Sequence, residues 1–159
     1  MNKTIFITGA TSGIGKACAY QFGANENRII ISGRRNERLL ELKKDLEEKF
    51  NAEVFTLSFD VRNQIQVAEA IESLPQEWKE IDVLINSAGL AVGLNKIQDG
   101  ELDDCERMID TNVKGLLYVT RAIAPNMVAR KSGHIINIGS IAGKETYPFG
   151  KVYCATKHA

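Results

Sequence analysis

The chain has 159 residues, of which 44% are hydrophobic and 25% are charged, and its 20 basic residues balance its 20 acidic ones. This composition is typical of an ordered globular protein, and the zero formal net charge argues against a nucleic-acid binder, which usually carries a basic excess. No apolar run approaches the roughly 18 residues that a membrane span needs. The first apolar stretch ends at Gly9 and is too short for a signal peptide.

The cysteine pattern indicates a reducing compartment. Three cysteines, an odd number without a CxxC pair, lie far apart at Cys18, Cys105 and Cys154. Secreted domains more often carry paired cysteines, and the spacing here matches no zinc site. We therefore expect a cytoplasmic protein that has neither a disulfide nor a metal site.

Short apolar runs alternate with helical patterns along the chain. The apolar runs predict strands at residues 3–8, 28–32, 53–59, 82–86 and 134–139. Helical patterns predict helices at residues 13–24, 36–50, 63–73, 102–110 and 113–130. Asn63 and Gln66 resemble a capping box at the third helix, and Pro125 is expected to kink or shorten the last one.

Near-continuous apolar strands separated by helices are the signature of a parallel sheet covered on both faces. The predicted fold class is therefore α/β, with a doubly wound, Rossmann-type sheet. No linker or repeat divides the chain, so residues 1–159 are expected to form a single domain.

A glycine-rich turn joins the first predicted strand to the first helix and reads TGATSGIG from Thr8 to Gly15. At such a turn glycine lets the backbone approach a pyrophosphate, and the helix N-terminus offers free N–H groups. The turn fits neither a Walker A loop, because Ala17 follows Gly15-Lys16, nor GxGxxG, because Cys18 stands at the last glycine position. We expect this turn to bind phosphate, and the alternative is a purely structural turn. The expected contacts are Gly9, Thr11, Ser12, Gly13, Ile14 and Gly15.

The ends of the second and third strands bear on the choice of nucleotide. An acidic residue in this part of such folds holds the ribose 2′-hydroxyl, but here Arg34 and Arg35 occupy the region. Their guanidinium groups match a phosphate and favour NADP(H) over NAD(H), although they could simply flank a helix start. Asp60, with Val61 beside it, is suited to accept from an adenine amino group, or to cap the next helix.

Four further residues suggest a catalytic site. Tyr153 and Lys157 are four residues apart, which places both on one face of a helix, although such a spacing is also common in surface pairs. Ser140 follows the fifth strand, at the edge where sites of parallel sheets open. Asn112 falls between two predicted helices.

Together these motifs resemble the short-chain dehydrogenase/reductase family over the whole chain. The glycine turn, Asp60-Val61 and the strand end Asn86-Ser87-Ala88-Gly89 are similar to the family's cofactor segments, although Ser87 replaces its usual second asparagine. Asn112, Ser140, Tyr153 and Lys157 match its catalytic residues in chain order. Residues 87–93 and 133–143 most resemble the NADP-dependent 3-hydroxy acid and serine dehydrogenases.

The resemblance implies a role for each residue. Tyr153 would exchange a proton with the substrate, and Lys157 would supply the positive charge that favours its phenolate and bind the nicotinamide ribose. Ser140 would hold the substrate oxygen, and Asn112 would hold a water that links Lys157 to solvent. The implied cofactor contacts therefore include Asn86, Ala88, Gly89, Tyr153 and Lys157.

The implied function is that of an NADP-dependent oxidoreductase that interconverts a secondary alcohol and a carbonyl, with a small 3-hydroxy acid as the expected substrate. The alternatives are a nucleotide-binding module and a truncated chain, both without turnover, because family members usually continue well past Ala159. We expect the sheet to stop after its fifth strand and leave it as an exposed edge. Lys151, before Tyr153, either attracts a substrate carboxylate or is solvated.

The resemblance also implies that the full-length form is a homodimer or homotetramer, paired through the helix at residues 113–130. No nucleic-acid or membrane partner is expected.

Overall fold

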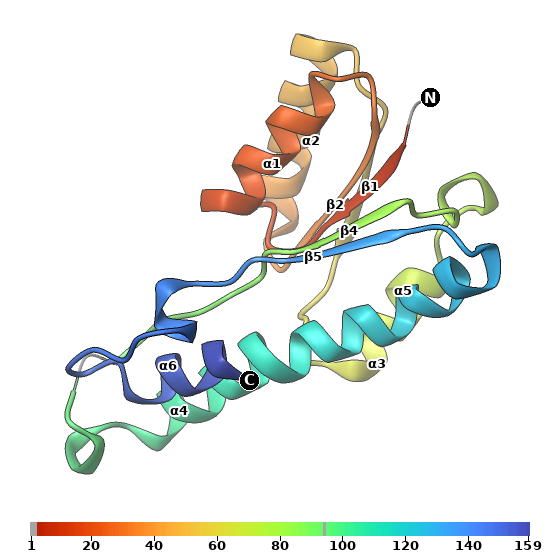
Figure 1. Cartoon of the computed structure of the whole chain (residues 1–159). Helices are drawn as coiled ribbons and strands as arrows, with labels where there is room; N and C mark the ends of the chain where they lie inside the picture. Colours follow the sequence, from red (N-terminus) through yellow and green to blue (C-terminus); the bar gives the residue numbers. More distant parts are fainter. Residues whose placement is uncertain (1–2, 94) are drawn as a thin grey trace.

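The computed structural model describes residues 3–93 and 95–159. Five parallel strands form one sheet in the order β3-β2-β1-β4-β5 (Figure 1). Since the chain leaves β1 first toward one edge and later toward the other, the sheet is doubly wound, and the predicted fold class is confirmed. The strands are β1 (Thr4–Ile7), β2 (Arg28–Gly33), β3 (Val54–Ser58), β4 (Val83–Asn86) and β5 (His134–Asn137).

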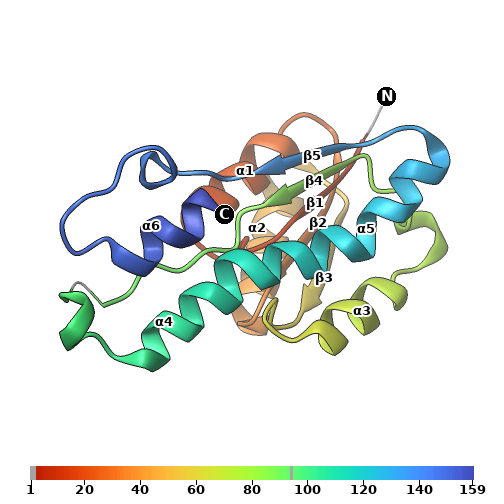
Figure 2. The ribbon, with the colours of Figure 1, turned by 60° about the horizontal axis from the view of Figure 1, so that its bottom comes forward.

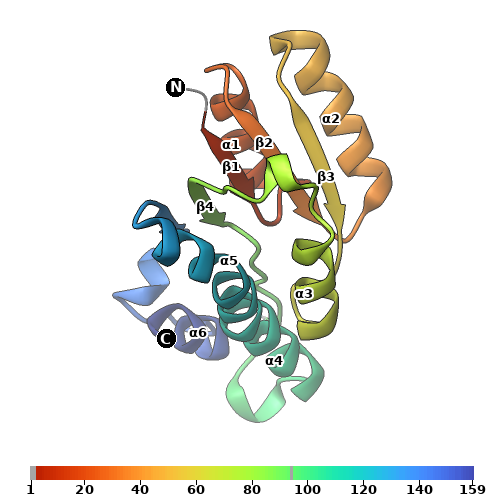
Figure 3. The same cartoon turned by 90° about the vertical axis from the view of Figure 1, so that its right-hand side faces the viewer.

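Helices cover both faces of the sheet. The helices α1 (Gly13–Gly23) and α2 (Asn36–Phe50) lie on one face, and α3 (Gln64–Glu72) and α5 (Leu116–Arg130) lie on the other (Figures 1 and 3). Alternating side chains of the central strand serve both layers: Ile5 and Ile7 pack toward α1 and α2, whereas Phe6 packs toward α3 and α5. Each face therefore has its own buried core.

The two helices expected at residues 102–110 and 113–130 are one continuous helical stretch (Figure 2). A π-helical segment, Asp110–Gly115, joins α4 (Leu102–Ile109) to α5, so Asn112 lies inside a helix and not in a connection. The expectation that Pro125 shortens the last helix is wrong, because α5 continues to Arg130. Because proline has no N–H, the carbonyl of Arg121 one turn earlier loses its helical hydrogen bond. Pro125 and Arg121 are both exposed, so water can donate to that carbonyl instead.

The capping box expected at α3 forms only in part. The Asn63 side chain accepts hydrogen bonds from the amides of Ile65 and Gln66, both at 3.1 Å. The Gln66 side chain, however, accepts from the amide of Asp60 and not from that of Asn63. Asn63 therefore caps the helix, while Gln66 ties it to the end of β3.

The last part of the chain lies beside α4. Helix α6 (Lys151–His158) packs against α4, and a short 3-10 turn, Ile141–Gly143, precedes it (Figure 2). Two further 3-10 turns are Gln76–Trp78 and Ile97–Asp99. As expected, β5 forms one edge of the sheet, with residues that are exposed or half-buried. In the described parts of the chain, no helix is long and apolar enough to cross a membrane.

Candidate functional site

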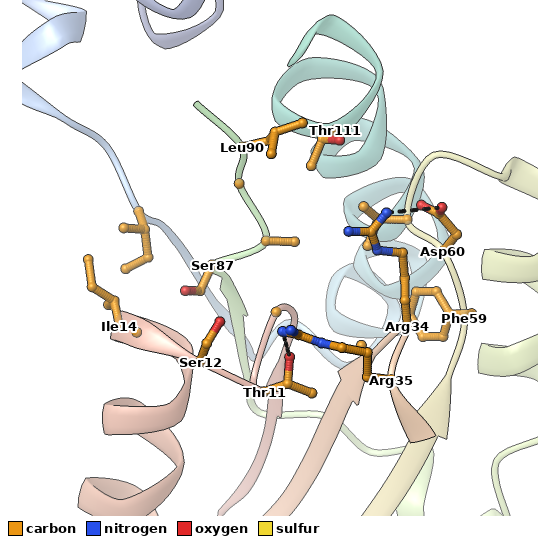
Figure 4. Close-up of a pocket in the computed structure, with 17 residues that line it drawn as sticks. Thr11, Ser12, Ile14, Arg34, Arg35, Phe59, Asp60, Ser87, Leu90 and Thr111 are labelled. Atoms are coloured by element: carbon orange, nitrogen blue, oxygen red, sulfur yellow. Dashed lines mark hydrogen bonds and ion pairs between the residues drawn. The ribbon is translucent and has the colours of Figure 1, made fainter. Parts of the chain in front are cut away.

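A cavity of about 320 Å³ opens at the carboxyl ends of the strands (Figure 4). Four segments form most of its wall: the turn after β1, the end of β2 with the two residues before α2, the residues that follow β3, and the residues that follow β4. This is the position at which doubly wound sheets bind their ligands. The predicted cofactor residues that line it are Gly9, Thr11, Ser12, Gly13, Ile14, Arg34, Arg35, Asp60, Val61, Ala88 and Gly89.

The glycine turn combines close packing with an open surface. Gly9 has φ +64°, and a Cβ there would lie 2.8 Å from the Cα of Ala88. Gly15 does not line the cavity; a Cβ on it would lie 2.5 Å from the carbonyl oxygen of Gly9. Gly13 has φ +54° but no heavy atom within 4 Å of a Cβ position, so its surface is free for a ligand. The first turn of α1 therefore offers its amides to the cavity.

Thr8 holds two walls of the cavity together, a role that the sequence reasoning missed. Its side chain is buried, and its Oγ1 accepts hydrogen bonds from the amides of Ser87 and Ala88, both at 3.0 Å. These bonds fix the segment after β4 against the glycine turn. The sequence does not predict these hydrogen bonds, since threonine, like other β-branched residues, is common in strands.

Both arginines lie at one end of the cavity, next to the end of β2. The Arg35 guanidinium donates to the Thr11 hydroxyl at 2.8 Å (Figure 4). Arg34 lies 3.8 Å from a carboxylate oxygen of Asp60, and 61% of its side chain remains exposed. The structure therefore places two positive charges where a nucleotide phosphate can reach them.

Asp60 is held in an ion pair that the sequence did not predict. The Arg62 side chain donates to both carboxylate oxygens, at distances from 2.6 to 3.0 Å. Burial raises the pKa of the Asp60 carboxyl, but the hydrogen bonds and charge of Arg62 outweigh it and hold that pKa below its usual value. The alternative role of helix cap is wrong, because Asn63 is the N-cap of α3.

Asn86 lies beneath the cavity and does not line it. Its side chain is 5% exposed, and its amide nitrogen donates to Thr120 and Asn137, both at 3.0 Å. It therefore connects β4 to α5 and β5. Its Oδ1 atom is buried and has no hydrogen-bond partner in the described part of the chain.

The predicted catalytic residues lie around the ends of β4 and β5 without forming a hydrogen-bonded set. Tyr153 and Lys157 share one face of α6, with the Lys157 ammonium 5.9 Å from the centre of the Tyr153 ring. That ammonium donates to the carbonyl of Ile138 at 2.9 Å. Ser140 is exposed, and its hydroxyl accepts from the amide of Ala142. Within residues 3–93 and 95–159, no hydrogen bond joins the side chains of Ser140, Tyr153 and Lys157.

The Asn112 side chain is bonded to protein atoms on both sides. Its Oδ1 accepts from the amide of Leu90 at 2.7 Å, and its Nδ2 donates to the carbonyl of Leu90 at 2.8 Å and to the Thr156 hydroxyl at 2.9 Å. The side chain is 7% exposed. Because both Nδ2 hydrogens are already donated, Asn112 can bind a relay water only as an acceptor, through one of its own oxygen atoms.

A second cavity, of about 180 Å³, lies beside Tyr153. Lys151 also lines it, together with mainly apolar side chains, and its ammonium donates to the carbonyl of Lys96 at 3.1 Å. Lys151 is therefore half-buried and in contact with protein, which differs from the solvated alternative expected from the sequence. The other lining residues are Ala91, Val92, Gly93, Met108, Tyr147, Phe149 and Gly150.

Comparisons with known proteins agree with this geometry. The model of the short chain dehydrogenase family matches residues 3–159. The NADP-dependent 3-hydroxy acid dehydrogenase YdfG of Salmonella typhi is 50% identical over 153 residues, which cover 96% of this chain and 60% of that protein. The NADP-dependent 3-hydroxy acid dehydrogenase of Schizosaccharomyces pombe is 46% identical over 158 residues, or 99% and 61% of the two chains.

Solved structures give the same result. Serine dehydrogenase from Escherichia coli superposes with a TM-score of 0.90 at 47% identity, covering 98% of this chain and 69% of that one. A closed form of serine dehydrogenase complexed with NADP⁺ gives a TM-score of 0.90 at 48% identity, with 98% and 61% coverage. The chain thus spans about 60% of the length of the curated relatives it matches. Matched along almost its entire length, the chain belongs to the short chain dehydrogenase family.

Proposed function

We propose that the chain binds NADP(H) and forms the cofactor-binding and catalytic part of an oxidoreductase that interconverts a secondary alcohol and a carbonyl. The substrate is a small 3-hydroxy acid or a related hydroxy compound. One observation carries the proposal: a glycine-lined cavity at the carboxyl edge of the sheet has two arginines at one end. The names of the relatives, NADP-dependent dehydrogenases of hydroxy acids, support the same assignment.

The residues of the cavity fit this cofactor. Gly13 and the first turn of α1 suit a pyrophosphate, because no side chain covers the backbone there. Arg34 and Arg35 suit the additional 2′-phosphate of NADP(H). Asp60 is nearby, but its carboxylate is neutralised by Arg62 and therefore opposes a phosphate less than a free carboxylate would. When bound, NADP(H) supplies or accepts the hydride.

The chain's own residues handle the proton and the substrate oxygen. During reduction, the Tyr153 hydroxyl donates a proton to the carbonyl oxygen; during oxidation, its phenolate removes the proton from the alcohol. The Lys157 ammonium lies on the same helix face, 5.9 Å from the centre of the Tyr153 ring, and places a positive charge beside it. The exposed Ser140 hydroxyl holds the substrate oxygen. Asn112, which donates to Thr156 of α6, holds the water that links Lys157 to solvent.

The second cavity supports an acidic substrate. It lies beside Tyr153, most of its lining is apolar, and Lys151 is its charged residue. A short carbon chain would contact the apolar lining, and the carboxylate of a hydroxy acid would pair with the ammonium. This arrangement favours a hydroxy acid over a neutral alcohol.

Turnover tests the proposal and separates it from a nucleotide-binding module. The protein at the full length of its relatives is mixed with NADPH and a series of 3-oxo acids, ketones and aldehydes, and the loss of NADPH absorbance is followed. We expect turnover, fastest with a 3-oxo acid, and its loss in Tyr153→Phe while NADPH still binds. NADPH binding without turnover of any substrate would establish the binding module; turnover by Tyr153→Phe would refute the role of Tyr153.

Assembly and location belong to the same proposal. Leu102, Leu117 and Val128 on α4 and α5 are 77%, 56% and 74% exposed, respectively, which favours an interface between copies of the whole protein. We infer a homodimer or homotetramer in the cytoplasm, without nucleic-acid or membrane partners. Light scattering on the whole protein tests this, with Leu117→Glu expected to weaken the assembly.

A further inference from the structure

The Asn112 amide lies where three segments meet. It bonds the backbone of Leu90 on both sides, it belongs to the π-helical segment between α4 and α5, and it donates to Thr156 of α6. Leu90 itself lines the nucleotide cavity. A continuous set of hydrogen bonds therefore runs from the wall of that cavity to the helix that carries Tyr153.

Thr156 completes this set. Its hydroxyl accepts the hydrogen bond of Asn112 at 2.9 Å and donates its own hydrogen to the carbonyl of Tyr153 at 2.8 Å. The residue is 7% exposed, so water has little access to the hydroxyl. A side chain without a hydroxyl would leave an amide hydrogen of Asn112 unpaired in a buried site, which is costly.

We propose that Thr156 is a positioning residue: through Asn112 it fixes the Tyr153–Lys157 face of α6 against the Leu90 wall of the cavity. The catalytic part of this inference rests on the proposed function, whereas the tether itself does not. Thr156 lies three residues after Tyr153 and directly before Lys157. The hydrogen bond of Thr156 therefore affects the positions of both side chains, Tyr153 and Lys157.

Few other hydrogen bonds hold α6 in place. The helix spans Lys151–His158, which is too short to be stable in isolation. In the described part of the chain, its other side-chain hydrogen bonds to distant segments come from Lys151 and Lys157; the first of these bonds is exposed and the second is partly buried. The bond between Asn112 and Thr156 is buried. Because buried hydrogen bonds are exchanged less readily for bonds to water, it is the tether best suited to fix the helix.

Hydrogen exchange of the 159-residue chain tests the tether without cofactor or turnover. In Thr156→Val, the Leu90 amide, which donates to Asn112, should exchange at least about tenfold faster than in the wild type. The amides of Ser87 and Ala88 are bonded to Thr8 instead and serve as internal controls that keep their protection. Thr156→Ser keeps the hydroxyl and should protect Leu90 as the wild type does. An unchanged Leu90 amide in Thr156→Val would overturn the proposal.

Kinetics of the whole protein test the catalytic consequence. We expect Thr156→Val to lower kcat about 10- to 100-fold, the scale of a small misplacement of catalytic groups, and to leave the Kd of NADPH within about twofold. Thr156→Ser should restore kcat. Wild-type kcat in Thr156→Val would overturn the positioning role.

Failure of the proposed function and unfolding of the variant can both be told apart from failure of the tether. If the wild type binds NADPH without turnover, the proposed function fails, and the exchange rate of Leu90 still decides the tether. If Ser87 and Ala88 also lose protection in Thr156→Val, that variant has unfolded, and Thr156→Ala takes its place in both experiments, with the same two results expected.

Discussion

Replacing Gly9 by alanine tests how the glycine turn builds the nucleotide cavity. Gly9 has φ +64°, and a Cβ there would lie 2.8 Å from the Cα and 2.9 Å from the nitrogen of Ala88. Gly13, four residues on, provides a matched control: its φ is +54°, but a Cβ would meet no heavy atom within 4 Å. The two substitutions therefore share the conformational cost, and only the first adds a clash.

The magnitudes follow from these two contributions. An L-residue in the left-handed region costs about 1–2 kcal/mol, and forcing an extra methyl into a packed site costs about 1–3 kcal/mol more. Ala88 cannot easily move away, because its amide is bonded to the buried Thr8 hydroxyl. We therefore expect Gly9→Ala to lower the free energy of unfolding by about 2–5 kcal/mol and Gly13→Ala by about 1–2 kcal/mol.

Urea unfolding of both variants, followed by circular dichroism, measures these free-energy differences. Thermal unfolding checks them: at about 2–4 °C per kcal/mol for a chain of this size, the melting temperature should fall by roughly 4–20 °C in Gly9→Ala and roughly 2–8 °C in Gly13→Ala. Equal destabilisation of the two variants would refute the reasoning, because it would show that the contact with Ala88 adds nothing.

Three further predictions concern other parts of the chain. Thr8→Val leaves the two partly buried amides after β4 unpaired. We expect urea unfolding to show a loss of about 2–5 kcal/mol, and a loss below about 1 kcal/mol would contradict this. Because Arg62 lowers the pKa of Asp60 in the folded state, this carboxylate stabilises the protein above the unfolded pKa, near 3.8, and the contribution is lost as the pH falls through the folded value. The stability difference between wild type and Asp60→Asn should therefore shrink in unfolding curves as the pH falls below 3.8, and a constant difference would argue against the ion pair. In the whole protein, the preference for a hydroxy acid over its methyl ester is measured as the ratio of their kcat/KM values, and Lys151→Met should lower this ratio about tenfold. Lys96→Met removes a nearby lysine outside the cavity lining and should leave the ratio unchanged. Equal ratios in the two variants would exclude Lys151 as the carboxylate partner.

The sheet could be predicted from the sequence because local pattern and burial agree. The run Ile29–Ile31 in β2 is apolar and its side chains are buried on both faces of the sheet, so no tertiary contact had to override the pattern. Leu39, Leu42 and Leu46 of α2 likewise fall on one stripe and are buried, whereas Leu40, off that stripe, is exposed. At Pro125 the expectation of a shorter helix failed, because the helix lies with that residue on its exposed face and tolerates the missing hydrogen bond.

The positions of the site residues were predicted better than their partners. The turn from Gly9 to Ile14 and the arginines at the end of β2 do line one cavity, since parallel strands end at the same edge. The bonds of Asn112 to Leu90 and Thr156 join residues 22 and 44 positions apart, and no local pattern reports such contacts. The π-helical turn that carries Asn112 also has no recognised sequence signal.

The affinity of the chain for NADPH relative to NADH tests the central claim most directly. Fluorescence titration of the 159-residue chain measures both dissociation constants, and Arg35→Ala reports on the guanidinium that faces Thr11. Charge-assisted contacts to a phosphate amount to about 1.5–3 kcal/mol each, so we expect NADPH to bind at least about tenfold more tightly than NADH, and the preference to fall about tenfold or more in Arg35→Ala. Equal affinities for the two nucleotides in the wild type would contradict the assignment of this cavity to NADP(H).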